Sequence, residues 1–301
     1  MAYLIHGYNI QTKWGIIAIK PNNSDLALSG FLDLPARLGK CYHSWGATHG
    51  VEPYTNASEI RLGGRDLVLL GAIMGANRQE CIEKLNAFYK YINDLNSLIE
   101  FASPYSAHQV YVKEPVIGEY LGETGLRIMV TMREPEPVVD GSIPQPTGEY
   151  GIDGIDWSSF GAVLISLEGD RRNRPSGKDA SFTAYRKEGW GITKTEAGKL
   201  NMKLYIKQST YQDFANKIGG LQQLFIKPGE RNLIVKEDLQ RRVFACNGFK
   251  VTDIRNNDGW YGMVQIELIE SQIPQIITYL ADNAGNYIID NSNNKILIKW
   301  Q

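Results

Sequence analysis

Apolar and polar residues alternate in the last strand that we predict for each half of the chain. Ile128 and Val130 alternate with polar residues in GLRIMVTMREPEP, and Val264 and Ile266 do so in GMVQIELIESQIP. This period of two residues is typical of half-buried antiparallel strands. Earlier segments of the same β-rich kind precede each: LIEFAS and HQVYVKEPVIGEYL in the first half, NLIVKED and RRVFACNGFKVTDI in the second.

A helical period predicts one amphipathic helix in each half, before these strands. Each helix begins with a capping-box pattern, Asn77 with Glu80 and Ser209 with Gln212. In such a box the first side chain accepts from a free helix N–H and the other reaches back. The predicted apolar faces are Cys81, Leu85, Phe88 and Ile92 in one helix, and Phe214, Ile218, Leu221 and Phe225 in the other.

Pairs of an aromatic residue and glycine recur at a nearly constant spacing. Each half has a turn, a first pair and a β-branched strand, and then a second pair 30 or 31 positions further on. With the helices and closing strands in the same order, this predicts a duplication. The repeated structural anchors are Trp14, Gly15, Trp45 and Gly46 in the first half, and Phe160, Gly161, Trp190 and Gly191 in the second.

The duplication divides the chain into two similar domains. The stretch EPEPVVDGSIPQPTGEYG around their boundary contains four prolines, as expected of a linker. We predict tandem β-rich α+β domains, each an antiparallel sandwich or open barrel with one helix, and a terminal β-hairpin formed by NYIID and KILIKW. The segment 51–62 is the expected insertion in the first half. The boundaries are 1–136, 137–150 (linker), 151–274 and 275–301 (C-terminal arm).

Composition narrows the functional classes. The chain has 301 residues with 32 Lys and Arg against 33 Asp and Glu, so no basic field indicates nucleic-acid binding. Three scattered cysteines make a disulfide framework unexpected. We expect no signal peptide, and the ten-residue apolar run 67–76 is about half a membrane span. These features are typical of a soluble protein assembled in a reducing compartment.

The stretch LEGDRRNRPSGKDA invites comparison with a phosphate-binding loop. Gly169 and Gly177 are eight positions apart instead of five, and Asp179 follows Lys178 where a hydroxyl should stand. The next residues have a strand pattern, whereas a phosphate-binding loop leads into a helix. The sequence therefore does not favour nucleotide binding.

By position, this stretch matches the loop 20–40 of the first half. Both are polar excursions between the two aromatic-glycine pairs, and we expect long loops or a protruding hairpin. The copy in the second half is the more basic. We predict that its cationic side chains contact a neighbouring subunit: Arg171, Arg172, Arg174 and Lys178.

Other candidate chemistry is weak. Cys41, His43 and His49 lie close together, but no carboxylate joins them at a metal-site spacing. Asp153 and Asp156 could suit a glycosidase, yet DGIDW favours a turn. We therefore predict no catalytic, cofactor-binding or metal-binding residue, no cofactor and no enzyme activity. The four histidines are expected on the surface or in loops: His6, His43, His49 and His108.

The 16 tyrosines and six tryptophans leave a second class open, a two-domain protein that binds or processes carbohydrate. That class requires exposed tryptophans in a groove. A place in the core or an interface is the favoured interpretation for the tryptophans outside the repeat, Trp157, Trp260 and Trp300.

The order of elements resembles the tail-tube domain of long-tailed bacteriophages and related injection machines. The matching residues are WGIIAI, SWG and the helix at Asn77, and FGAVLIS, GWGI and the helix at Ser209. The likeness covers most of residues 1–274. Distal tail (Dit-like) proteins and baseplate hub proteins share this domain, and hub proteins carry two per chain.

This resemblance implies a non-enzymatic structural protein of a phage or prophage tail. Tube domains join their sheets edge to edge into a ring around a DNA channel, which would pair open sheet edges. Two such domains per chain would close a ring as a trimer or a hexamer. The implied partners are other copies of the chain and neighbouring tail or baseplate proteins, with DNA passing unbound and no membrane contact. The implied location is the virion, assembled in the bacterial cytoplasm.

Overall fold

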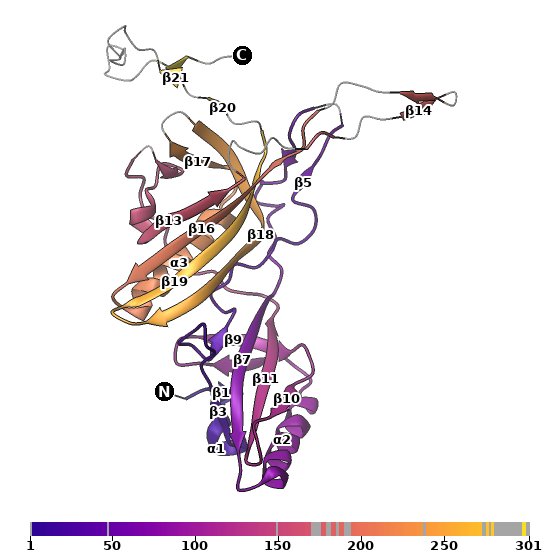
Figure 1. Ribbon diagram of the computed structural model, residues 1–301, viewed down its shortest axis with the longest axis vertical. Helices are drawn as coiled ribbons and strands as arrows, with labels where there is room; N and C mark the ends of the chain where they lie inside the picture. The colour runs from indigo at the N-terminus through magenta and orange to yellow at the C-terminus, as the bar shows by residue number, and fades with distance from the viewer. Residues whose placement is uncertain are drawn as a thin grey trace.

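The computed structural model contains two main β-sheets, one from each half of the chain (Figure 1). Every strand pair among the described residues is antiparallel. The fold is therefore β-rich with few helices, as the sequence predicts. The structure describes residues 2–46, 48–148, 150–169, 176–178, 182–184, 187–189, 194–236, 239–272, 275–276, 278–279 and 297–298.

The first sheet has the strand order β2-β1-β8-β9-β11-β7-β3, with β10 also on β11 and β4 also on β7. Its strands are β1 (Leu4–Ile5), β2 (Tyr8–Asn9), β3 (Ile16–Ala18), β4 (Leu28–Ser29), β7 (Arg65–Met74), β8 (Ile99–Ala102), β9 (Ala107–Val112), β10 (Ile117–Tyr120) and β11 (Gly125–Glu134). Its helices are α1 (Ile10–Trp14) and α2 (Arg78–Asn93), and β5 (Tyr42–His43) and β6 (Glu52–Pro53) form a separate pair.

The second sheet has the order β12-β17-β18-β19-β16-β13, with β20 also on β18. Its strands are β12 (Gly151–Ile152), β13 (Ala162–Glu168), β16 (Gly198–Gln208), β17 (Arg231–Lys236), β18 (Leu239–Asn256), β19 (Trp260–Glu270) and β20 (Gln275–Ile276). Its helices are η1 (Trp157–Phe160) and α3 (Tyr211–Ile226).

The two sheets are connected in the same way. When six strands of each half are numbered along the chain, their spatial order is 1-4-5-6-3-2 in both sheets. The long helix lies between the third and fourth of these strands in both halves. The domain boundaries and the duplication remain predictions, but the connectivity of the halves is alike.

Both long helices lie where the sequence predicts them. In α2, Asn77 Oδ1 accepts from the N–H of Glu80 at 3.0 Å, and Glu80 accepts from the N–H of Ala76 at 2.7 Å. In α3 the predicted cap is wrong by one residue. Thr210, and not Ser209, accepts from the N–H of Asp213 at 3.1 Å. Of the predicted faces, only Ile92 is not fully buried.

The first aromatic-glycine pair of each half ends a short helix, where we predicted a plain turn. Trp14 and Phe160 are the buried last residues of α1 and η1. Gly15 and Gly161 follow with φ of 69° and 61° and cap the helix from the left-handed region. The strands β3 and β13 begin directly after them.

The loop of the first half does not protrude. Residues 22–37 run along β18 of the second sheet, where Leu34 and Phe249 exchange two backbone hydrogen bonds of 3.0 Å. Asp25 and Arg37 donate their N–H groups to β18 carbonyls on either side. The loop therefore lies along the edge of β18 like an added strand. The pattern of apolar and polar residues in the loop does not indicate this contact. The second-half hairpin of β14 (Phe182–Ala184) and β15 (Lys187–Gly189) does protrude (Figure 1).

The expected insertion also packs on the second sheet. Val51 is buried against Phe244 and Ile269, and its N–H donates a hydrogen bond to the carbonyl of Ser271 at 3.0 Å. The predicted linker packs as well, because Gln223 on α3 donates to the carbonyl of Val139 at 2.7 Å. One continuous hydrophobic core therefore extends through both halves.

Only part of the expected C-terminal hairpin falls within the described residues. Its last strand, β22 (Leu297–Ile298), pairs with β21 (Thr278–Tyr279). Residues 286–290, the expected partner, lie outside the described residues.

Candidate functional site

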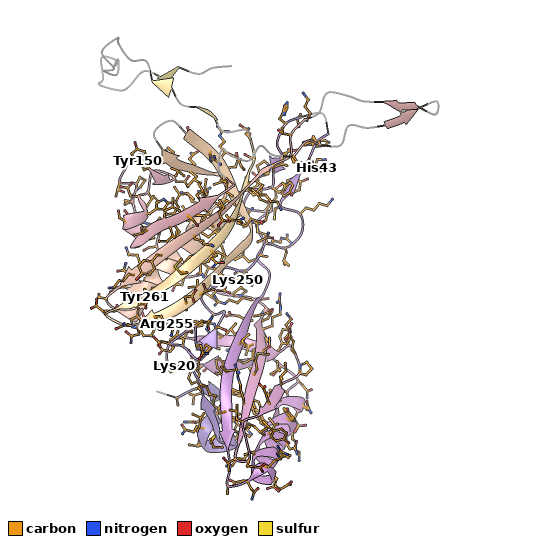
Figure 2. The ribbon with its side chains drawn as sticks, viewed as in Figure 1. Lys20, His43, Tyr150, Lys250, Arg255 and Tyr261 are labelled. Atoms are coloured by element: carbon orange, nitrogen blue, oxygen red, sulfur yellow. The ribbon has the colours of Figure 1, made fainter. Side chains whose placement is uncertain are left out.

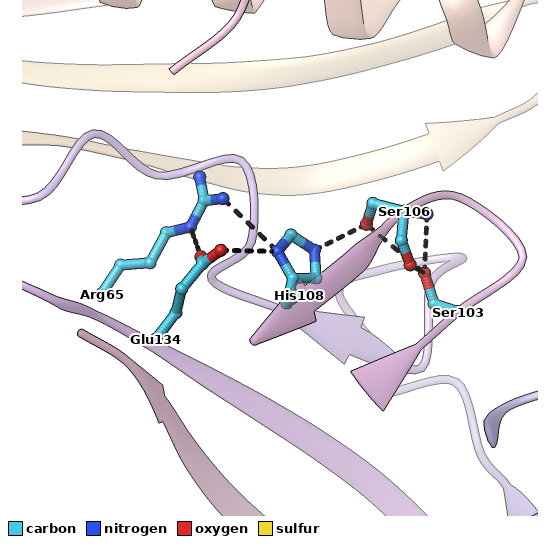
Figure 3. Close-up of polar contacts among 5 residues, drawn as sticks. All are labelled: Arg65, Ser103, Ser106, His108 and Glu134. Atoms are coloured by element: carbon cyan, nitrogen blue, oxygen red, sulfur yellow. Dashed lines mark hydrogen bonds and ion pairs between the residues drawn. The ribbon is translucent and has the colours of Figure 1, made fainter. Parts of the chain in front are cut away.

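A buried cluster of charged side chains lies at one end of the first sheet (Figure 3). Arg65 at the start of β7 and Glu134 at the end of β11 are cross-strand neighbours, with Nε and Oε2 2.5 Å apart. His108 on β9 places Nδ1 3.1 Å from Glu134 Oε1. Ser106 places its Oγ 2.7 Å from His108 Nε2 and lies in the turn closed by Ser103. The expectation of an exposed or loop position is wrong for His108, which is buried in a strand.

The cluster is electrostatically balanced. Burial alone would raise the pKa of Glu134, but the hydrogen bonds and charges of His108 and Arg65 hold it below its usual value. The order Ser106, His108, Glu134 is that of a catalytic triad. However, Arg65 Nη2 lies 3.4 Å from the same imidazole nitrogen, Nδ1. Arg65 also binds the Glu134 carboxylate, so the carboxylate does not serve the imidazole alone as it does in a triad. We therefore interpret the cluster as a polar clamp between β7, β9 and β11.

The second half has a matching pair. Glu270 ends β19 as Glu134 ends β11, and Arg241 on β18 lies 3.7 Å from it, Nη1 to Oε2. Glu270 follows Glu134 by 136 positions, the spacing of the closing strands, and Arg241 follows His108 by 133. Both members of the pair are buried. Comparison of HQVYV with RRVFA could have found this position, because the same valine stands two residues after each basic one.

Of the predicted contact residues, only Lys178 falls within the described residues. Its Nζ is buried and donates to the carbonyls of Trp45, Thr48 and Gly50 at 2.6, 2.8 and 2.7 Å. Three carbonyls of its own chain therefore surround the ammonium of Lys178, and its contact with another subunit stays a prediction. The other three predicted contact residues lie outside the described residues: Arg171, Arg172 and Arg174.

The second aromatic-glycine pairs are less uniform. Trp45 is 52% exposed, its ring is tilted against that of His43 with centroids 4.1 Å apart, and its Nε1 donates to Glu52 at 2.6 Å. This tryptophan is therefore not part of the hydrophobic core, and its role as a repeated structural anchor stays a prediction. Gly46 beside it has open space around its Cα. Trp190 and Gly191 lie outside the described residues.

The tryptophans outside the repeat are packed where they are described. Trp260 contacts the rings of Tyr105 and Tyr211 at 5.8 and 5.2 Å between centroids. Trp157 packs against the core, and Trp300 lies outside the described residues. These positions do not form the exposed groove that the carbohydrate class requires.

The junction between the halves is polar and tight. The carboxylate of Asp33 accepts from the N–H of Val251 at 2.8 Å, and burial raises the pKa of Asp33 to about 6. Asp25 accepts from the N–H of Asn256 at 2.8 Å. Arg255, labelled on β18 in Figure 2, donates to the carbonyl of Asn22. The second half of β18, residues 246–256, thus has its edge filled by the same chain.

Two other strand edges are exposed. All four residues of β10 are exposed, including Ile117 at 54% and Tyr120 at 47%. On β13, which pairs with β16 alone among the described strands, Val163 and Ile165 are exposed. Apolar side chains on open edges are typical of surfaces that take a partner.

The described residues contain no group of three or more His, Cys, Asp or Glu side chains that could hold a metal ion. Within the same residues, no helix is long and apolar enough to cross a membrane.

No protein-family model matches the sequence, and no curated protein matches it. Among solved structures, the chain is similar to the Dit protein of phage SPP1, whose description is a paradigm of the hub adsorption apparatus in phages that infect Gram-positive bacteria. The two share 8% sequence identity with a TM-score of 0.35, over 89% of this chain and 98% of that one. We draw no functional conclusion from a match at this TM-score.

Proposed function

We propose that the chain is a non-enzymatic structural component of a phage or prophage tail, of the distal-tail or baseplate-hub type. Copies of it would form a ring around the DNA channel in the virion, after assembly in the host cytoplasm. The order of elements supports this class. The observation that carries the proposal is an edge that is filled in one half and bare in the other.

The cross-strand registers identify the equivalent edges. Ile117 on β10 lies opposite Met129, and Lys250 on β18 lies opposite Gln265. Met129 and Gln265 are 136 positions apart, the spacing of the closing strands. The four residues of β10 therefore correspond to residues 250–253 of β18, the part that the segment 22–37 covers.

The exposed edge of β10 needs a binding partner from outside the molecule. A sheet edge presents unpaired N–H and C=O groups, and proteins that stay monomeric protect such edges with charge, proline or a covering segment. Here the covering segment is present on β18 and absent from β10 among the described residues. A second copy of the chain is the simplest source of a cover.

Charge supports the same contact. The segment around β10 carries Glu119 and Glu123, and both are exposed. Arg171, Arg172 and Arg174 follow β13 in the sequence. A head-to-tail contact of this kind repeats with every copy, and it forms a closed ring when the rotation between neighbouring copies divides a full turn. We propose three or six copies, with neighbouring tail proteins above and below.

The test compares two exposed apolar residues that are changed to lysine. Ile117→Lys places a charge on the β10 edge and is expected to reduce assembly, since edge lysines block strand addition. Val138→Lys, at a position that is 76% exposed and off the edge, is expected to leave assembly unchanged. Native mass spectrometry and light scattering would measure the copy number.

Reversal of Arg171, Arg172 and Arg174 to Glu is expected to impair assembly while the monomer stays folded. A wild-type chain that remains monomeric at high concentration would overturn the ring proposal. Normal rings from Ile117→Lys would overturn the β10 contact alone.

A further inference from the structure

Two cysteines from opposite halves of the chain meet on the outer end of the second sheet. Cys246 lies in β18 and belongs to a small buried cluster with Val51, Phe244 and Ile269. Cys41 packs against that cluster, and the ring of the next residue, Tyr42, lies 6.1 Å from that of Phe244. The two cysteines are 205 positions apart in the sequence.

Cys41 packs against the buried cluster that contains Cys246, so the two side chains lie together at one site. Hydrogen bonds of the backbone hold both residues in place. The carbonyl of Cys246 accepts from the N–H of Arg37 at 2.8 Å, and the carbonyl of Cys41 accepts from the N–H of Tyr54 at 2.7 Å. Both cysteines are free thiols in this structure.

The two thiols differ in access. Cys246 is buried, and burial together with its neighbour Cys41 raises the pKa of its thiol. Cys41 is half-buried and is the sulfur that a small reagent reaches first. The charge of the Arg37 guanidinium acts against the rise in the pKa of the Cys246 thiol without cancelling it. The third cysteine, Cys81, is buried in α2 and donates to the carbonyl of Ile73, away from this site.

We propose that Cys41 and Cys246 are a redox-active pair that closes into a disulfide between the two halves when the protein meets a small-molecule disulfide. The thiolate of Cys41 attacks the external disulfide and releases one thiol, which takes up a proton. The Cys246 thiol then loses its proton and displaces the second thiol from the mixed disulfide. One external disulfide is reduced to two thiols, and two protein thiols become one disulfide.

The bond would join the first-half segment 37–54 covalently to β18. A crosslink between residues so far apart removes much conformational freedom from the unfolded chain, and it is expected to raise the midpoint of thermal unfolding by roughly 10 °C. The inference does not depend on the proposed place of the chain in a tail.

The experiment incubates the full chain with oxidised glutathione, alkylates the remaining thiols under denaturing conditions and maps the peptides by mass spectrometry. We expect loss of two of the three thiols, a linked peptide that contains Cys41 and Cys246, and the rise in midpoint, reversed by dithiothreitol. Cys81→Ser is expected to behave as the wild type. Cys41→Ser is expected to form no link.

Three outcomes would overturn the pair. These are a stable glutathione adduct on Cys41 without the link, a link that involves Cys81, and a dimer joined through Cys41. Because the mapping is carried out on the wild-type chain, it holds even if a substitution at the buried Cys246 impairs folding.

Discussion

Single side chains tie the strands of each half together through buried charge. Glu134 meets both His108 and Arg65, and Glu270 meets Arg241 at the equivalent place. A buried carboxylate is tolerated only where cations and donors replace its water. An acid–base pair therefore lies at the corresponding place in both halves, with histidine as the basic partner on β9 and arginine on β18.

Removal of the Glu134 charge is expected to leave Arg65 buried without its counter-ion. Glu134→Gln should destabilise the fold by about 3 kcal/mol at pH 7, while exposed Glu123→Gln should change it by less than about 0.5 kcal/mol. The pKa of Glu134 is lowered in the fold, so its stabilisation is present at neutral pH and is lost as the pH falls through its folded pKa. Urea unfolding at pH 7 and pH 3 would measure this. Equal losses for the two variants would contradict the prediction.

The contribution of Asp33 to stability depends on pH in the opposite direction to that of Glu134. Its folded pKa of about 6 exceeds the ordinary 3.8, so the fold binds a proton that the unfolded chain has lost. Stability should be fully present below about pH 4 and should fall as the pH rises through about 6. Asp33→Asn keeps an oxygen for the N–H of Val251 and should remove this slope, stabilising the protein by about 2–3 kcal/mol at pH 7.

The control for Asp33 is exposed Asp258→Asn, which should retain the wild-type slope. Unfolding free energies from pH 4 to 8 would show the difference. A slope that persists in Asp33→Asn would contradict the assignment.

At the scale of elements, helix α3 contains two glycines at the point where the segment that connects the halves packs against it. Gly219 and Gly220 lie inside the helix, where glycine costs about 1 kcal/mol relative to alanine. A Cβ on Gly219 would lie 2.0 Å from the carbonyl oxygen of Asp140, and one on Gly220 would lie 2.6 Å from that of Ser142. The glycines thus admit the backbone that joins the two halves.

Gly219→Ala should therefore destabilise the protein by about 2 kcal/mol despite the gain in helix propensity, because the clash involves backbone that cannot turn away. Asn216→Ala, exposed on the same helix, should change stability by less than about 0.5 kcal/mol. Thermal unfolding of both variants would decide. A stabilised Gly219→Ala would show that the connecting segment lies elsewhere.

Local patterns predicted the elements well and their partners poorly. The helical period identified α2 and α3, and alternation identified β11 and β19, because these signals repeat within a few residues. The covering of β18 by the segment 22–37 has no local signal, since Asp25 and Asp33 look like ordinary loop residues until their partners some 220 positions away are known. The sequence placed Lys178 in a polar loop for the same reason, and only the fold shows three carbonyls around it.

At the scale of the whole molecule, the two halves are not independent units. The segments 22–37 and 41–54 of the first half lie on the second sheet, and the hydrophobic core is continuous. Two domains joined by a plain linker would unfold separately, whereas shared packing couples them.

We therefore expect one cooperative transition in scanning calorimetry of the reduced protein, with equal calorimetric and van't Hoff enthalpies. Probes in each half should report the same midpoint, for example fluorescence in variants that keep only Trp14 or only Trp260 of the six tryptophans. Two separate transitions would show that the contacts of the first-half segments with β18 contribute little.

The contact of residues 22–54 with β18 also determines when this part of the chain can fold during synthesis. Residues 22–54 leave the ribosome about two hundred residues before β18, the strand that they cover. The first half is therefore fully synthesised before the strand on which this segment packs. Contacts so distant in sequence are formed late and slowly. The nascent chain thus exposes a polar, proline-containing segment during synthesis, and the final closure of the molecule waits for β18.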